Sequence, residues 1–237
     1  MPKVKDKYYK SFLEGDLIHL IDREGIEKVI KNIKNFRVRG KPYDLTEQAR
    51  ALVFIAWATG ARPCEIVDMV AGDVNKEGSY IKVRLRGAKG AFARVIYLPY
   101  RDPLVKEFYE YTKGMPPQMY LFWFFRSRYV RRRTETTITV RDPETGEKKK
   151  IKKVYTKPYP MKADRIRYYF RRWFSVLFED GITPYYLRHN RFSSLATKGE
   201  TLENIRMLKG AKTYDSCIVY THMSKDMAKK ISRKLIE

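Results

Sequence analysis

The sequence predicts an α+β fold that is mostly helical, with a small antiparallel sheet and a basic β-hairpin insertion. Three observations predict it. Apolar residues recur at helical spacing over residues 45–58 and again from residue 161 onward. Residues 80–85 and 94–98 alternate between apolar and polar side chains, as strands do. Residues 134–155 form a long polar hairpin pattern that has too few apolar residues to belong to a core.

The first 43 residues are basic and roughly helical, and they are too few for a substantial domain of their own. We expect two apolar helical faces here, the first made by Leu13, Leu17, Leu20 and Ile21, the second by Ile26, Val29, Ile30 and Ile33. The Arg-Gly-Lys-Pro run at residues 39–42 is typical of a linker. It separates this segment from a domain over residues 44–237.

The helix over residues 45–58 is expected to be capped by Asp44 or Thr46 and to end at Thr59-Gly60. A second helix begins near Arg62-Pro63, because proline suits the first helical turn. The two strands are joined through residues 87–90, and Asp102-Pro103 opens another helix. In the hairpin, residues 142–146 form the turn. The C-terminal helices are interrupted at Gly181, Gly199 and Gly210, and the last one spans residues 224–236.

The charge of the chain indicates a polyanionic partner, although a basic surface that only aids solubility is an alternative. The formal net charge is +23, and residues 126–172 hold 17 Lys and Arg against 5 Asp and Glu. Phosphates attract such a stretch, and the displaced counterions favour binding. The candidate DNA-contacting residues are Arg126, Arg128, Arg131, Arg132, Arg133, Lys148, Lys149, Lys150, Lys152 and Lys153.

Several protein classes are disfavoured. Cys64 and Cys217 are far apart and the histidines are scattered, which argues against a zinc site and a disulfide framework. No apolar run is long enough to cross a bilayer, and no signal peptide is visible. We therefore expect a cytoplasmic, nucleoid-associated protein without a metal, cofactor or membrane partner. The abundance of Lys, Glu and Ile, with few glutamines, is typical of thermophile proteins.

Three short segments contain the residues expected to carry chemistry. Residues 58–66 read Ala-Thr-Gly-Ala-Arg-Pro-Cys-Glu-Ile, which puts Arg62 at a helix N-terminus that favours an anion. Residues 183–192 read Thr-Pro-Tyr-Tyr-Leu-Arg-His-Asn-Arg-Phe, and residues 208–222 contain Leu-Lys-Gly-Ala and then Tyr-Thr-His. Arginine clamps phosphate well because its planar group donates two parallel hydrogen bonds. A simple ion pair between Arg62 and Glu65 is the alternative for the first segment.

In order and spacing, these segments resemble the tyrosine recombinase family, which includes phage-type integrases and Xer-type resolvases. The resemblance covers about residues 45–223 and implies the catalytic domain of such an enzyme. It assigns Arg62 and Arg188 to the two arginine positions, Lys89 to the hairpin lysine and Tyr220 to the nucleophile. Glu65 takes the acidic position. Residues 1–43 then correspond to a remnant of the family's core-binding domain, and residues 44–237 to its catalytic domain.

Two positions depart from the family pattern. Tyr185 stands where a histidine is usual, and Ala211 stands where histidine or tryptophan is usual. Tyr185 is kept among the catalytic candidates, while Glu65, His189, Ala211 and Lys212 are supporting candidates, with His189 or Lys212 as substitutes for the missing groups. Some integrases of archaeal viruses and plasmids vary at the same positions, so the chain resembles that group.

The resemblance implies DNA strand cleavage and rejoining without a metal or ATP. Arg62 and Arg188 would neutralise the scissile phosphate, and Tyr220 would attack phosphorus to give a 3′-phosphotyrosine. Lys89 would protonate the leaving 5′-oxygen. The implied partners are double-stranded DNA and further copies of the chain, assembled as a tetramer on the DNA.

Two other hypotheses stay open at this point. One is a DNA-binding protein of the same fold with weak or no catalysis, which the two departures favour. The other is an unrelated basic architectural or RNA-binding protein, although the sequence contains no recognisable RNA-binding motif.

Overall fold

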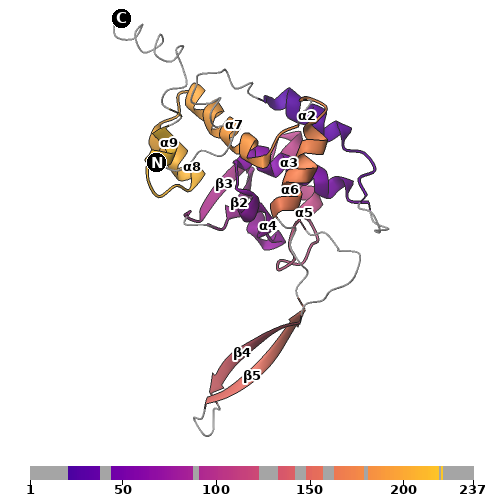
Figure 1. Ribbon diagram of the computed structural model, residues 1–237, viewed down its shortest axis with the longest axis vertical. Helices are drawn as coiled ribbons and strands as arrows, with labels where there is room; N and C mark the ends of the chain where they lie inside the picture. Colours follow the sequence, from indigo (N-terminus) through magenta and orange to yellow (C-terminus); the bar gives the residue numbers. More distant parts are fainter. Residues whose placement is uncertain are drawn as a thin grey trace, which may run out of the picture.

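The computed structural model describes residues 21–37, 44–87, 91–122, 133–141, 148–156, 163–178, 181–218 and 220. A long helix, α3 (Thr46–Thr59), lies at the centre of the helical part and packs against α2 (Arg23–Asn32), α5 (Pro103–Thr112) and α7 (Pro184–Thr197) (Figure 1). Most of its side chains are buried. A helix that is apolar on every side belongs in the interior, so the composition of residues 46–59 explains this position.

The ends of α3 confirm one expectation and correct another. The helix ends at Gly60, which adopts a left-handed conformation with φ 58°. At the start, neither Asp44 nor Thr46 is the capping residue, because that position is taken by Leu45. Asp44 Oδ1 accepts hydrogen bonds from the amide (2.9 Å) and the hydroxyl (2.6 Å) of Thr46. The Thr46 hydroxyl in turn accepts the amide of Phe36 at 2.7 Å, so it holds the preceding loop rather than the helix end.

The helix α2 confirms one of the two N-terminal apolar faces. Ile26, Val29 and Ile30 are buried on it, and Ile33 is buried directly after it. Asp22 caps the helix by accepting the amide of Gly25 at 2.9 Å. The first face, made by Leu13, Leu17 and Leu20 with Ile21, lies outside the described residues except for Ile21, which is buried.

The described residues contain a three-stranded antiparallel sheet of β1 (Val74–Glu77), β2 (Tyr80–Leu85) and β3 (Arg94–Pro99), in that order. The short helix α4 (Pro63–Val67) and a 3₁₀ turn, η1 (Ala71–Asp73), connect α3 to this sheet. The pairing of Val83 with Ile96 sets the register of β2 and β3. Buried and exposed residues alternate along both strands, which confirms the predicted strand pattern. The predicted helix after Asp102-Pro103 is α5, with Asp102 as its cap.

The predicted hairpin consists of β4 (Arg133–Arg141) and β5 (Lys148–Thr156). The strands are antiparallel, and Ile138 lies opposite Ile151. Figure 1 shows the hairpin extending away from the helices, as expected for a segment with few apolar residues. The turn at residues 142–146 and the candidate DNA contacts Arg126, Arg128, Arg131 and Arg132 lie outside the described residues.

The C-terminal part is helical with the predicted interruptions. The helices α6 (Ala163–Phe174), α7, α8 (Leu202–Lys209) and α9 (Asp215–Ile218) are separated at Gly181, Gly199 and Gly210, all of which have positive φ. A small second core lies apart from the main one and consists of Phe192, Ala196, Ile205, Ala211, Cys217 and Tyr220. Tyr220 is therefore held by α7, α8 and α9 together. The expected terminal helix at residues 224–236 lies outside the described residues.

Within the described ranges, none of the helices combines the length and the apolar character needed to cross a bilayer. The same ranges contain no cluster of His, Cys, Asp and Glu side chains suited to a metal ion.

Candidate active site

Arg62 stands at the sharp turn between α3 and α4, where the chain reverses after Gly60. A Cβ at Gly60 would lie 3.1 Å from the Phe192 ring, so glycine is needed both for its positive φ and for this close approach. Arg62 precedes the first residue of α4, and its amide donates to Glu65 Oε2 at 2.7 Å. The Arg62 guanidinium reaches Glu65 Oε1 at 3.5 Å and keeps 22% of its side chain exposed.

The side chain that pairs most closely with Glu65 is that of Arg94, which was not predicted from the sequence. Arg94 Nη1 and Nη2 donate to Glu65 Oε1 and Oε2 at 2.8 and 3.0 Å, and both side chains are buried. Burial by itself raises the pKa of Glu65, but hydrogen bonds and charge from Arg94, together with the Arg62 amide, outweigh it and hold the pKa below 4.5. Arg94, Ile96 and Leu98 are the inward positions of β3. The signal that could have identified Arg94 from the sequence was therefore its charge at an inward-facing position of an alternating strand.

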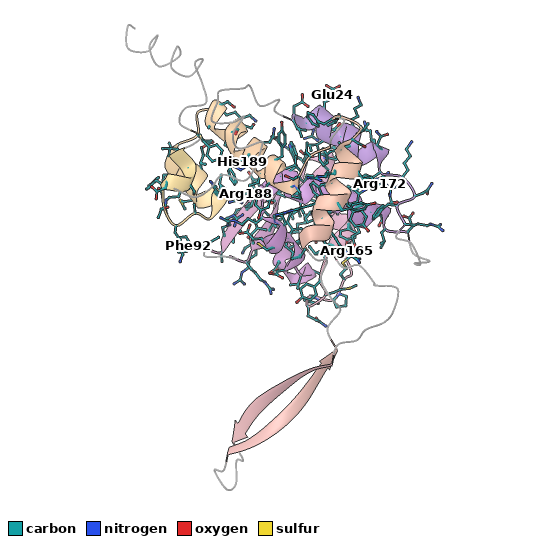
Figure 2. All side chains as sticks on the ribbon, in the orientation of Figure 1. Glu24, Phe92, Arg165, Arg172, Arg188 and His189 are labelled. Carbon is teal, nitrogen blue, oxygen red and sulfur yellow. The ribbon has the colours of Figure 1, made fainter. Side chains whose placement is uncertain are left out.

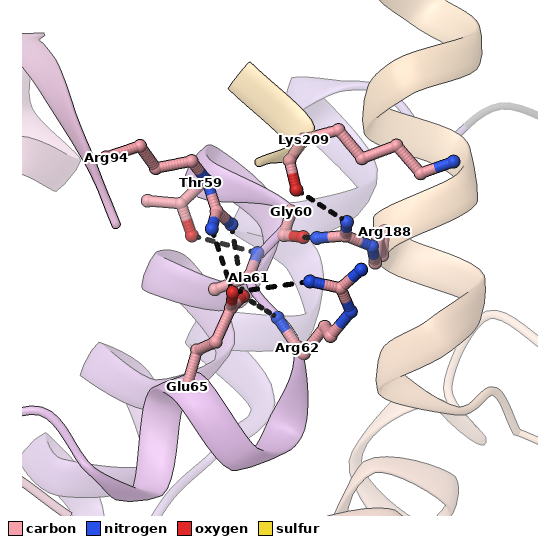
Figure 3. A network of polar contacts seen from close by, with 8 residues as sticks. All are labelled: Thr59, Gly60, Ala61, Arg62, Glu65, Arg94, Arg188 and Lys209. Carbon is pink, nitrogen blue, oxygen red and sulfur yellow. Dashed lines mark hydrogen bonds and ion pairs between the residues drawn. The ribbon is translucent and has the colours of Figure 1, made fainter. Parts of the chain in front are cut away.

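Arg188 lies on α7 with 4% of its surface exposed. Its Nη1 donates to the carbonyl of Gly60, and its Nη2 donates to the carbonyl of Lys209 at 2.9 Å (Figure 3). Each of these nitrogens carries a second hydrogen that can face an anion. Burial and the neighbouring Arg62 lower the pKa of Arg188 to about 10, although Glu65 acts in the opposite direction. A buried guanidinium beside a second one is stabilised when an anion joins them.

Tyr220 lies against the same helix, with 2% of its surface exposed. Its hydroxyl is hydrogen-bonded to Nδ1 of His189 at 3.2 Å. Its ring centroid lies 6.1 Å from that of Phe192, and the ammonium of Lys209 lies 4.9 Å from the ring centroid. Arg188 is electrostatically coupled to Tyr220 as well as to Arg62. Three segments that are distant in sequence thus converge on one small region.

Five of the predicted site residues are brought together here: Arg62, Glu65, Arg188, His189 and Tyr220. Ala211 is buried in the second core beside Tyr220. Lys212 is exposed on the loop between α8 and α9. Tyr185 is partly buried near the start of α7, with the Arg167 guanidinium 5.4 Å from its ring centroid.

The remaining predicted contacts are not placed by the structure. Lys89 lies outside the described residues, in the gap between β2 and β3. Arg133 and Lys148, Lys149, Lys150, Lys152 and Lys153 belong to β4 and β5, where only the strand pairing is described. Figure 2 shows that Arg165 and Arg172 of α6 lie on a different side of the molecule from His189.

Lys209, the last residue of α8, is a second residue that the sequence reasoning passed over. It is buried, and its ammonium donates to the carbonyl of Ser216. Burial, together with Arg188 and Arg62, lowers its pKa to about 8, while Cys217 opposes this shift. Among the described residues, Arg62, Arg94 and Arg188 act on a single carboxylate, that of Glu65, and the Lys209 ammonium adds a further positive charge close to Arg188 and Arg62. Such an excess of positive charge in a largely buried site is suited to a phosphate group.

The arrangement of helices around α3, with a three-stranded sheet beside them, is the fold of tyrosine recombinase catalytic domains. The structure is similar to that of XerA recombinase, with a TM-score of 0.57 and 17% sequence identity over 90% of this chain and 63% of that chain. It is also similar to the XerH site-specific recombinase bound to its palindromic difH substrate, with a TM-score of 0.56 and 18% identity over 91% of this chain and 53% of that one.

A third similar structure is the Tn1549 transposon integrase in complex with circular intermediate DNA, with a TM-score of 0.51 and 18% identity. That match covers 90% of this chain and 66% of the integrase chain. The chain thus spans between 53% and 66% of the length of these structures. No protein-family model and no curated protein matches the sequence. The similarities establish the fold and confirm the fold class expected from the sequence.

Proposed function

We propose that this chain is the strand-cleaving domain of a site-specific DNA recombinase or integrase that acts through a 3′-phosphotyrosine intermediate. The observation that carries the proposal is the convergence of Arg62, Arg188 and Tyr220 in one cluster with excess positive charge. The expected domain boundary, with residues 44–237 as the catalytic domain, belongs to the same proposal.

The proposed reaction transfers a phosphodiester from a DNA 5′-oxygen to the phenol of Tyr220. Arg62 and Arg188 bind the non-bridging oxygens and stabilise the charge that grows on them in the transition state. The phenol oxygen forms a bond to phosphorus while the bond to the 5′-oxygen breaks. Since the phosphotyrosyl bond retains the free energy of the phosphodiester, reversal by another 5′-hydroxyl needs neither ATP nor a further activating group.

The proton of the phenol has a candidate acceptor. The Tyr220 hydroxyl contacts His189 Nδ1 at 3.2 Å, and in the tautomer whose Nδ1 carries no hydrogen, His189 takes up the proton as Tyr220 attacks. We assign the protonation of the leaving 5′-oxygen to Lys89, following the family pattern. Because Tyr220 is only 2% exposed, its phenol must emerge before it can reach a DNA phosphorus. Cleavage therefore requires a local rearrangement of the α9 segment when DNA binds.

A covalent-capture experiment tests this proposal without a known target site. A library of random-sequence duplexes with 5′-bridging phosphorothiolates is incubated with the protein, since the thiol released on cleavage does not reverse the reaction. Protein–DNA adducts that survive detergent are then isolated and sequenced. We expect adducts with the wild type and none with Tyr220→Phe, and adduct formation by Tyr220→Phe would show the nucleophile to be wrong.

The phosphate site can be tested separately with sulfate, whose charge is fixed near neutral pH. Sulfate binding to the native state should raise the melting temperature as its concentration rises. We expect a smaller rise for Arg62→Met, because this guanidinium is partly exposed and available to the anion. Arg84→Met is the matched control, since Arg84 is an exposed arginine on β2. Equal shifts in all three proteins would argue against a phosphate site at Arg62.

A second candidate function is DNA binding by the same fold with weak or no catalysis. Two observations favour it: Ala211 provides no polar side-chain atom beside Tyr220, and the Tyr220 ring is buried. This alternative predicts salt-dependent binding to duplex DNA without any detergent-stable adduct.

Tetramer assembly on DNA is part of the first proposal, and it would appear as adducts joining several protomers to one recombining DNA complex.

A further inference from the structure

Lys209 is an unusual residue to find in the small second core. It ends α8, directly before Gly210, and 7% of its surface is exposed. Lysine is almost never fully buried without a partner, because removing the ammonium from water is unfavourable. The neighbouring residues Ile205, Ala211 and Cys217 are buried and form an ordinary small core. An apolar side chain at position 209 would fill the same space in this core, so packing alone does not explain why the residue is a lysine.

The ammonium of Lys209 holds the short segment that carries the phenol. It donates a hydrogen bond to the carbonyl of Ser216 in α9, and it lies 4.9 Å from the centroid of the Tyr220 ring. This distance is within the range of a cation–π interaction. Between these two contacts, the amide of Tyr220 donates to the carbonyl of Cys217 at 2.9 Å. One side chain thus fixes both the start of the turn and the ring at its end.

The main chain of the same residue holds the arginine clamp. The Lys209 carbonyl accepts a hydrogen bond from Arg188 Nη2 at 2.9 Å, and Arg188 Nη1 donates to the carbonyl of Gly60 (Figure 3). Gly60 lies two residues before Arg62. Lys209 is therefore the point at which the nucleophile segment and the arginine clamp meet.

From these contacts we propose that Lys209 is a positioning residue that couples Tyr220 to Arg188, with its ammonium orienting the phenol ring and its carbonyl orienting the guanidinium. The inference rests on the proposed function and adds a residue to it. In this proposal Lys209, two positions before Ala211, takes over the role of the histidine or tryptophan that is usual at position 211. Lys212, the substitute expected from the sequence, is exposed on the loop.

The charged groups that face Lys209 make its effect dependent on pH. Arg188 and Arg62 oppose its protonation, Cys217 favours it, and burial is the largest influence, so its pKa is lowered to about 8. The cation that holds the Tyr220 ring is therefore lost just above neutral pH. Replacement by arginine keeps a cation at this position at any accessible pH, since arginine is not deprotonated in that range.

The experiment compares Lys209→Met, Lys209→Arg and the control Lys198→Met, which alters an exposed lysine at the end of α7. Single-turnover adduct formation is measured between pH 6.5 and about 9.5 on a duplex recovered by covalent capture, and duplex affinity is measured in parallel. We expect Lys209→Met to slow adduct formation by between about tenfold and about 100-fold, as a small misplacement of reacting groups does. Its duplex affinity should change less than about twofold, because Lys209 is buried and its ammonium is already engaged by the Ser216 carbonyl and the Tyr220 ring.

The pH profile distinguishes positioning by charge from simple packing. The wild type and Lys198→Met should lose rate as pH rises through about 8, the pKa of Lys209, whereas Lys209→Arg should keep its rate there. A second readout needs no DNA: with ring-labelled tyrosine, the Tyr220 signal, identified by its absence in Tyr220→Phe, should shift near pH 8 in the wild type and not in Lys209→Met.

The outcomes separate the two proposals. If the wild type forms no adduct with any duplex, the proposed function fails, and the role of Lys209 fails with it. If the wild type forms adducts and Lys209→Met forms them at the same rate with the same pH profile, only the Lys209 inference is overturned. A Tyr220 signal that titrates identically with and without the lysine also overturns it.

Discussion

Replacing Arg94 with methionine should reveal how strongly this site depends on its single buried carboxylate. Glu65 is fully buried and receives two hydrogen bonds from Arg94, at 2.8 and 3.0 Å. Methionine fills a similar volume but leaves Glu65 with the Arg62 amide at 2.7 Å and the Arg62 guanidinium at 3.5 Å. Breaking a buried ion pair by removing one partner destabilises a protein by about 3–5 kcal/mol. This is a large part of a typical total of about 5–15 kcal/mol.

Urea denaturation followed by circular dichroism measures this loss at pH 7. Lys82→Met is the matched control, because Lys82 pairs with Glu77 at 2.7 Å on the exposed side of the same sheet. Exposed pairs contribute about 0–1 kcal/mol, so this variant should be nearly neutral. The double variant Glu65→Gln/Arg94→Met should recover much of the loss, since it removes the uncompensated buried charge.

The pH dependence of the unfolding free energy provides a second test of the pair between Glu65 and Arg94. In the wild type, the pKa of Glu65 lies below 4.5, so its contribution to stability is present above that value and is lost as pH falls through the folded-state pKa. Without Arg94, burial dominates and raises the pKa of Glu65. Protonation of Glu65 at low pH then removes the unpaired buried charge, and the variant regains part of its lost stability. The difference in unfolding free energy should therefore narrow between pH 7 and about 4. A loss below about 1 kcal/mol at pH 7, or a difference that does not change with pH, would refute this account of the Glu65 pair.

Three further predictions follow from particular residues. Gly210→Ala should destabilise the protein by more than about 1 kcal/mol in urea, because Gly210 has φ 65° and a Cβ there would lie 2.9 Å from Arg94 Nη1 and from the Phe92 carbonyl; a neutral substitution would contradict the assigned backbone. The pKa of Lys209 is lowered to about 8 from 10.5, so the unfolded state binds more protons between these values and stability should rise with pH, by up to about 3 kcal/mol relative to Lys209→Met. Melting temperatures of the wild type and of Lys209→Met, measured across this pH range, check the prediction. The same dependence of melting temperature on pH in both proteins would count against it. Replacing Lys150, Lys152 and Lys153 of β5 with glutamine should reduce the salt dependence of duplex binding by up to about 0.9 per lost phosphate contact, measured by fluorescence anisotropy, and an unchanged slope would remove the hairpin from the DNA interface.

Long helices and regular strands were predictable because their signals are local. The apolar spacing of residues 46–59 and the glycine after them define α3 nearly to the residue. The alternation in β2 and β3 is equally local. By contrast, β1 was not anticipated, because only Val74 is buried among its four residues and its exposed positions show no alternation. Its place in the sheet comes from pairing with β2.

The cap of α3 shows how tertiary contacts redirect a local preference. Asp44 and Thr46 are both good capping residues, yet the Thr46 hydroxyl accepts the amide of Phe36, ten positions earlier. A polar side chain forms its hydrogen bond with whichever group the tertiary packing places next to it, and the local sequence pattern does not show which group that is.

The same division holds for the candidate site. The order and spacing of the three segments, which resemble the tyrosine recombinase family, were enough to propose Arg62, Arg188 and Tyr220 as the phosphate-binding and nucleophilic residues. Tertiary structure decided which groups support them. Arg94 reaches Glu65 across 29 positions, and Arg188 reaches the Gly60 carbonyl across 128. It also buried Lys209 against Tyr220 and left Lys212 exposed, since the burial of a charge depends on how α7, α8 and α9 pack together rather than on any local pattern.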